Sequence, residues 1–92
     1  MAGRYAAQVI ELLDRYSDRI RPTLVRSLRE KCVVGEWALV ANDLAWALVA
    51  TGIAVTAEDK ASFRDLLSAI TLPPDTPPDL ANQLLVDSSP QL

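Results

Sequence analysis

The chain has 92 residues and a net charge of -3; half of its residues are apolar and 23% are charged, which is the composition of one small globular domain. It contains no histidine, one cysteine and three widely separated glycines, so it lacks the commonest general base, the ligands of any usual zinc site and a phosphate-binding loop. We therefore expect a protein that is not an enzyme, holds no cofactor or metal, and acts by binding another macromolecule.

The first part of the chain predicts two amphipathic helices. Apolar side chains recur at spacings of three and four between residues 5 and 20, the period of one helix face, which predicts a helix over residues 3 to 20. Pro22 is disfavoured in a helix interior but suits a first turn, so it should end this helix and open the next. The apolar positions of the second helix are Leu24, Val25, Leu28 and Cys32.

The third predicted helix is the most apolar part of the chain. Glu36 suits the positive end of a helix dipole, and Gly52 favours the backbone conformation that commonly ends a helix. The main apolar stripe consists of Trp37, Val40, Ala41, Leu44 and Leu48. A different side carries Leu39, Trp46 and Ala50, interleaved with Asn42 and Asp43. A helix that is apolar nearly all round lies between neighbours or offers one side to a partner.

The last helix begins at a capping signal. Thr56 followed by Asp59 resembles a capping box and predicts a fourth helix that ends near Ile70. The adjacent acids Glu58 and Asp59 could suggest a catalytic or magnesium-binding pair, but helix neighbours point in different directions, and capping explains them better.

The segment after this helix has a different character. Four prolines between residues 73 and 78 disfavour a helix and favour an extended linker. Residues 79 to 86 could add one or two amphipathic turns, and residues 87 to 92 are predicted to form a tail. The predicted fold is therefore all-α: a small four-helix bundle over residues 1–72, followed by a Pro-rich, partly disordered C-terminal tail over residues 73–92.

Charge is distributed unevenly along the chain. Residues 1 to 31 contain seven basic and four acidic side chains, whereas the remainder contains two basic and eight acidic ones. This asymmetry can steer a charged partner toward one face, although ordinary surface charge is the alternative. Because acids are interleaved with the basic residues, direct nucleic-acid binding is not expected. No apolar stretch reaches the roughly 20 residues that cross a bilayer and no signal-peptide pattern is present, so we expect a cytoplasmic protein outside the membrane.

One part of the sequence resembles a known family. Residues 35 to 48 read GEWALVANDLAWAL, residues 51 to 56 read TGIAVT, and the next helix carries Phe63, Leu66 and Leu67. This layout resembles the MafI and CdiI type of small immunity protein, over about residues 20 to 75. Ala45 and Ala47 stand where that family often carries more polar residues. The resemblance implies a cytoplasmic antitoxin that binds the toxic domain of a secreted polymorphic or contact-dependent toxin.

Charge and helical position, not a family motif, indicate which residues would contact such a partner. An acidic helical protein suits capture of a basic, nuclease-like toxin domain. The candidate partner-binding residues are Glu36, Asn42, Asp43, Trp46, Glu58 and Asp65. Tryptophan is a favoured interface anchor, although burial of Trp46 within the bundle is the alternative. A second hypothesis is a small helical adaptor or regulatory protein that acts through homodimerisation or docking into a larger complex.

Overall fold

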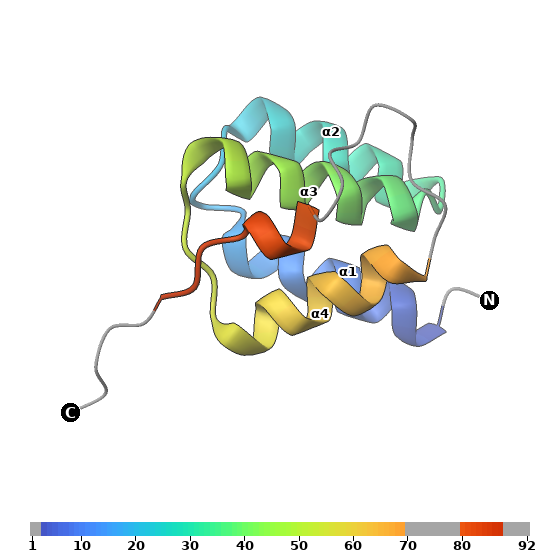
Figure 1. Ribbon diagram of the computed structural model, residues 1–92. Helices are drawn as coiled ribbons and strands as arrows, with labels where there is room; N and C mark the ends of the chain where they lie inside the picture. Colours follow the sequence, from blue (N-terminus) through green and yellow to red (C-terminus); the bar gives the residue numbers. More distant parts are fainter. Residues whose placement is uncertain (1–2, 70–79, 88–92) are drawn as a thin grey trace.

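The computed structural model describes residues 3–69 and 80–87, and in these residues the chain forms four α-helices and one short 3-10 helix (Figure 1). The elements are α1 (Gly3–Tyr16), α2 (Pro22–Val33), α3 (Trp37–Thr51), α4 (Ala57–Ser68) and the 3-10 helix η1 (Leu80–Gln83). The predicted all-α, four-helix fold is confirmed. Residues 70–79, which include Ile70 and the whole proline-rich segment, and residues 88–92 of the predicted tail lie outside the described residues.

The helix ends follow local hydrogen bonding. The first helix ends at Tyr16 and not at residue 20, because the backbone N–H of Arg19 donates to the Tyr16 carbonyl at 3.0 Å and the Ser17 hydroxyl donates to the Asp14 carbonyl at 3.1 Å. Such contacts close a turn and compete with the helical pattern. Gly52 ends α3 in the left-handed conformation, with φ of +69°, as its position in the sequence predicted.

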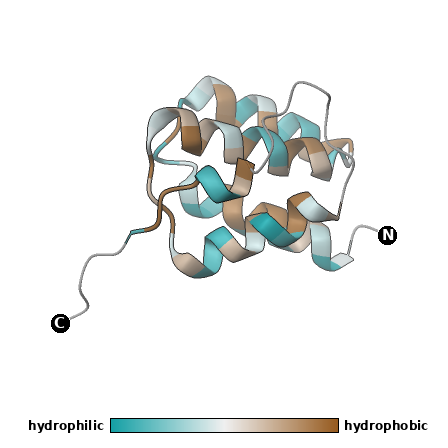
Figure 2. Ribbon diagram, in the orientation of Figure 1, coloured by the Kyte–Doolittle hydropathy of each residue, from teal (hydrophilic) through white to brown (hydrophobic). Residues whose placement is uncertain are grey.

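The helix α3 is the centre of the bundle and contacts α1, α2, α4 and η1. In Figure 1, α2 lies beside α3 on one side, while α1 and α4 lie on the other, and η1 lies against α3 and α4. Figure 2 shows hydrophobic residues recurring along the helices. Most of the predicted main stripe of α3 is fully buried: Val40, Ala41, Leu44 and Leu48. Trp37, at its start, is partly buried against the same core.

The core extends beyond the predicted limit near residue 72. Leu80, Ala81 and Leu84 are buried against α3 and α4, so the segment after the linker belongs to the packed domain. The sequence signal was weak because a single 3-10 turn is too short to display a helical period.

A short pairing of extended backbone holds the end of this segment. Val55 and Val86 form an isolated parallel β-bridge. The N–H of Val55 donates to the Leu85 carbonyl, and the N–H of Asp87 donates to the Val55 carbonyl, each at 2.8 Å. The link between α3 and α4 is therefore tied to the residues that follow η1.

The docking of residues 80–87 is testable with two neighbouring leucines. The side chain of Leu84 is 2% exposed and that of Leu85 is 53% exposed. Leu84→Ala should lower the free energy of unfolding by about 2 to 5 kcal/mol, the usual cost of truncating a buried leucine. Leu85→Ala should change it by no more than about 0.5 kcal/mol. Urea titration of both variants measures the difference, and equal small effects would mean that the segment does not contribute to the core.

Candidate functional site

Three of the predicted partner-binding residues lie on the side of α3 that is turned away from the core. Glu36 precedes the first residue of α3 and is exposed, Asp43 is partly exposed, and the side chain of Trp46 is 38% exposed. Their spacing places them along one side of the helix together with the exposed residues Leu39 and Ala50. We call these five residues, Glu36, Leu39, Asp43, Trp46 and Ala50, the α3 outer face. Trp46 is therefore not enclosed by the bundle.

The acid at the middle of this face already has a cationic partner in the chain. The Nζ of Lys31, near the end of α2, lies 3.1 Å from Oδ2 of Asp43, and about a third of each side chain is exposed. An exposed pair of this kind contributes little to stability, at most about 1 kcal/mol. It does reduce the negative charge that Asp43 presents, so the α3 outer face is more apolar and less acidic than the sequence suggested.

Asn42 does not belong to this surface. It is only 3% exposed, and its Oδ1 atom is buried with no hydrogen-bond partner among the described residues. It lies three residues before the fully buried Ala45, on a side of α3 that packs within the protein. Asn42 therefore lies apart from the exposed side chains of Glu36, Asp43 and Trp46, because neighbouring residues of a helix point in different directions. Its contact with a partner stays a prediction.

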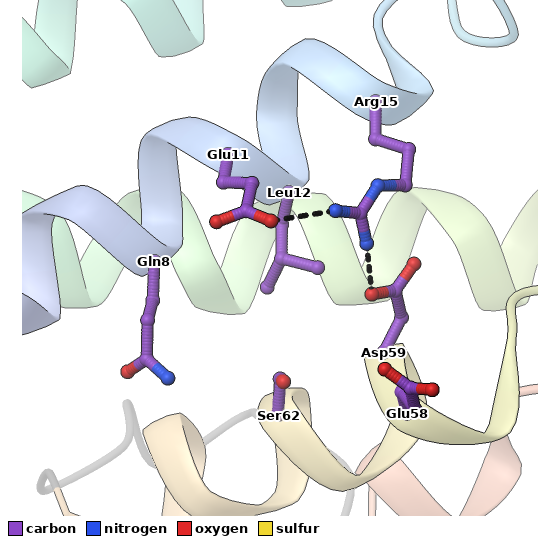
Figure 3. Close-up of a pocket in the computed structure, with 7 residues that line it drawn as sticks. All are labelled: Gln8, Glu11, Leu12, Arg15, Glu58, Asp59 and Ser62. Carbon is purple, nitrogen blue, oxygen red and sulfur yellow. Dashed lines mark hydrogen bonds and ion pairs between the residues drawn. The ribbon is translucent and has the colours of Figure 1, made fainter.

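The acids of α4 also lie elsewhere. Glu58 and Asp65 are exposed, but Glu58 lines a hollow of about 210 Å³ between α1 and α4. In Figure 3, four residues of α1 face three of α4 across it. The lining residues are Gln8, Glu11, Leu12, Arg15, Glu58, Asp59 and Ser62, none of which belongs to α3. The structure therefore divides the predicted acidic surface around Trp46 into two separate regions.

A partly buried polar network at the start of α4 was not predicted. The guanidinium of Arg15 binds Oδ1 of Asp59 and, at 2.7 Å, Oε1 of Glu11 (Figure 3). The hydroxyl of Tyr16 donates to Oδ2 of Asp59 at 2.5 Å. Asp59 is buried, and both of its carboxylate oxygens are engaged. It joins α1 to α4.

The same network completes the cap of α4. Thr56 Oγ1 accepts a hydrogen bond from the N–H of Asp59 at 3.0 Å, which is the predicted half of a capping box. In the reciprocal half the acid would accept from the N–H of Thr56. Here the N–H of Thr56 donates to the Tyr16 hydroxyl at 3.4 Å, and that hydroxyl donates to Asp59. Tyr16 thus hydrogen-bonds to both ends of the capping motif, the N–H of Thr56 and the carboxylate of Asp59.

The chemistry of this network is structural. The pKa of Tyr16 is raised from 10.0 to about 12, first because burial removes the hydroxyl from water and second because it donates to Asp59. Asp59 in turn raises the pKa of Arg15. Both groups keep their protons at neutral pH, so neither is poised to exchange one. In the described residues no group of three or more acidic, histidine or cysteine side chains could hold a metal ion.

Comparison with models of protein families, with curated proteins and with solved structures finds no match for the chain. Among the described helices none is long and apolar enough to cross a membrane.

The raised pKa of Tyr16 predicts a loss of stability at high pH. Below about pH 10 the Tyr16 hydroxyl is protonated in both the folded and the unfolded chain, and its contribution to the free energy of unfolding is complete. Between about pH 10 and about pH 12 the unfolded chain releases the hydroxyl proton of Tyr16, whereas the folded chain keeps it. The free energy of unfolding should therefore fall by about 1.4 kcal/mol per pH unit in that window. Tyr16→Phe lacks this titration, so its deficit relative to the parent should shrink as pH rises. Denaturant titrations at several pH values that showed a constant deficit would contradict the assignment.

Proposed function

We propose that this protein is a cytoplasmic immunity protein that binds and neutralises a cognate toxin domain through a stoichiometric protein–protein interface. It acts by occupying the toxin and not by catalysis. The proposal begins from the resemblance of about residues 20 to 75 to the MafI and CdiI type of immunity protein. The alternative, an adaptor that acts through homodimerisation or docking into a larger complex, would use the same kind of surface with a different partner.

One observation carries the proposal: the most apolar helix of the protein leaves Leu39 and Trp46 exposed on its outer face. Every other large apolar residue of α3 is buried or partly buried. An exposed tryptophan with apolar and charged neighbours is typical of the anchor residues that contribute most of the energy in protein interfaces. An interface of standard size, roughly 800 Å² per partner, would cover this face and its surroundings.

Charge supports a basic partner for the wider surface. No lysine or arginine occurs between residues 32 and 59, whereas Glu36, Asp43, Glu58 and Asp59 do. Lys31 neutralises Asp43 and Arg15 neutralises Asp59, so Glu36 and Glu58 are the acids of this stretch that have no ion pair within the described part of the chain. Glu36, which belongs to the α3 outer face, would act at the edge of an interface there, where charges chiefly raise the association rate.

The function is testable with the toxin domain that we expect the reading frame directly upstream to encode. That domain, induced in a heterologous host, should arrest growth, and co-expression of this protein should restore it. The two purified proteins should form a one-to-one complex. A toxin domain that remains active and unbound in the presence of this protein would refute the proposal.

The site is tested on the same complex with a matched pair of variants. Trp46→Ala should weaken binding at least about tenfold, mainly through faster dissociation, because it removes a desolvated anchor. Ile10→Ala is the control: Ile10 is 37% exposed, like Trp46, but lies on α1. Surface plasmon resonance gives both rates. If both variants bind like the parent, the toxin is held by another surface.

A further inference from the structure

Residues 80–87, which we call the C-terminal segment, pack on the helices as a separate unit. In Figure 1 this segment, drawn in red, lies against α3 and α4. Its buried side chains are those of Leu80, Ala81 and Leu84. Its backbone is held at the bridge, where Val55 makes one hydrogen bond to the residue before Val86 and one to the residue after it.

We propose that the C-terminal segment of one copy of the chain docks on the same surface of a second copy, so that two chains exchange their segments and form a symmetric dimer. Exchange of an identical element is a low-cost route to a dimer, because the contacts in the dimer are those already made within one chain. The fit of this partner is therefore visible in the monomer. The inference goes beyond the proposed function and does not rest on it.

The position of the C-terminal segment in the chain favours exchange. The segment follows all four helices, so its release leaves the connections between them intact. Residues 70–79 join it to α4, and four of them are prolines. Proline-rich sequences act as extended, semi-rigid spacers. A stiff spacer restricts the positions that a tethered segment reaches, which lowers its effective concentration at a site in its own chain. The advantage of the closed monomer over the exchanged dimer is smaller as a result.

The same contacts disfavour a chain that stays open. Undocking would return the side chains of Leu80 and Leu84 to water. It would also remove the two hydrogen bonds of Val55 and the one that Nζ of Lys60 donates to the Asn82 carbonyl at 3.2 Å. Docking on a second copy restores all of these contacts. The balance between monomer and dimer then depends on protein concentration, because the closed chain is favoured below the effective concentration of its own segment, on the order of millimolar for a short linker.

A disulfide placed across the bridge distinguishes the two arrangements. Val55→Cys and Val86→Cys, combined with Cys32→Ser, put thiols on the two residues of the bridge. Paired backbones lie about 4.8 Å apart, within the roughly 4.4 to 6.8 Å between Cα atoms that a disulfide joins. The reduced protein is incubated at concentrations from about 10 µM to about 1 mM and is then oxidised. In non-reducing electrophoresis the covalent dimer should increase at least about tenfold over this range, at the expense of the cross-linked monomer.

The matched control carries only Val86→Cys and Cys32→Ser. Val86 is 38% exposed, so the control reports disulfides that form by random collision. Val55 is 1% exposed, so a thiol at that position is protected from such collisions and reacts with a docked segment. At the highest concentration the variant with both bridge positions replaced should form several times more dimer than the control. Equal amounts of dimer would overturn the proposal.

A peptide supplies the C-terminal segment as a separate molecule and needs no cysteine. It has the sequence of residues 79–92 and a fluorescent label, and it is titrated into the full-length Leu84→Ala chain, whose own segment docks more weakly. The peptide should bind and raise the urea midpoint of this chain. A peptide with Leu84→Ala should bind at least about tenfold more weakly. A peptide with Leu85→Ala should bind like the parent peptide, because Leu85 is 53% exposed. If the Leu84→Ala chain does not fold, Leu80→Val replaces it.

The proposal requires both results. Cross-linked monomer alone at every concentration overturns it, and so does a peptide whose binding is unchanged by Leu84→Ala. If the parent dimerises in sedimentation experiments while the bridge thiols cross-link only within each chain, the two copies meet through another surface, and the proposal is overturned as well. None of these measurements involves a toxin, so the proposed function is tested separately.

Discussion

The burial of α3 determines how the bundle is arranged, because every other described helix packs on it. A single helix contacts α1, α2, α4 and η1, so its apolar side chains must satisfy several neighbours at once. Leu44 and Leu48 are fully buried, and the Ala-rich composition of the helix allows other elements to approach it closely. Such a helix has little surface left for polar residues. The side of α3 that faces solvent is correspondingly narrow and consists mainly of the five residues of the α3 outer face.

Helix formation in this protein was predictable because its determinants are local. The spacing of apolar residues, Pro22 in the first turn of α2 and Gly52 after α3 each act within a few residues, and the structure agrees with all three. The docking of residues 80–87 depends instead on contacts with α3, α4 and Val55. These contacts join positions far apart in the chain, so the local sequence of an eight-residue segment does not predict them.

The candidate site was predictable only in part, for the same reason. The position of Trp46 off the main stripe allowed either an exposed side chain or one buried against another helix, and the structure shows it 38% exposed. The burial of Asn42 likewise depends on how closely neighbouring elements surround α3. The pairing of Asp43 with Lys31 and the separation of Glu58 from Trp46 are likewise tertiary facts. Asp59 shows this most clearly. Its sequence context indicates a capping residue, whereas its binding to Arg15 and Tyr16 requires α1 to lie beside α4.

The bridge between Val55 and Val86 has a consequence for synthesis of the chain. Translation proceeds from α1 toward η1, so all four helices leave the ribosome before Leu80 and Leu84 are available to cover α3 and α4. Until that moment the apolar side chains of α3 and α4 lack their contacts with η1, and the Val55 carbonyl and N–H lack the hydrogen bonds of the bridge. Domains that expose apolar surface during synthesis are prone to aggregate or to engage chaperones. In this protein the exposure ends only after residue 87 has been synthesised and its N–H can donate to the Val55 carbonyl in the link between α3 and α4.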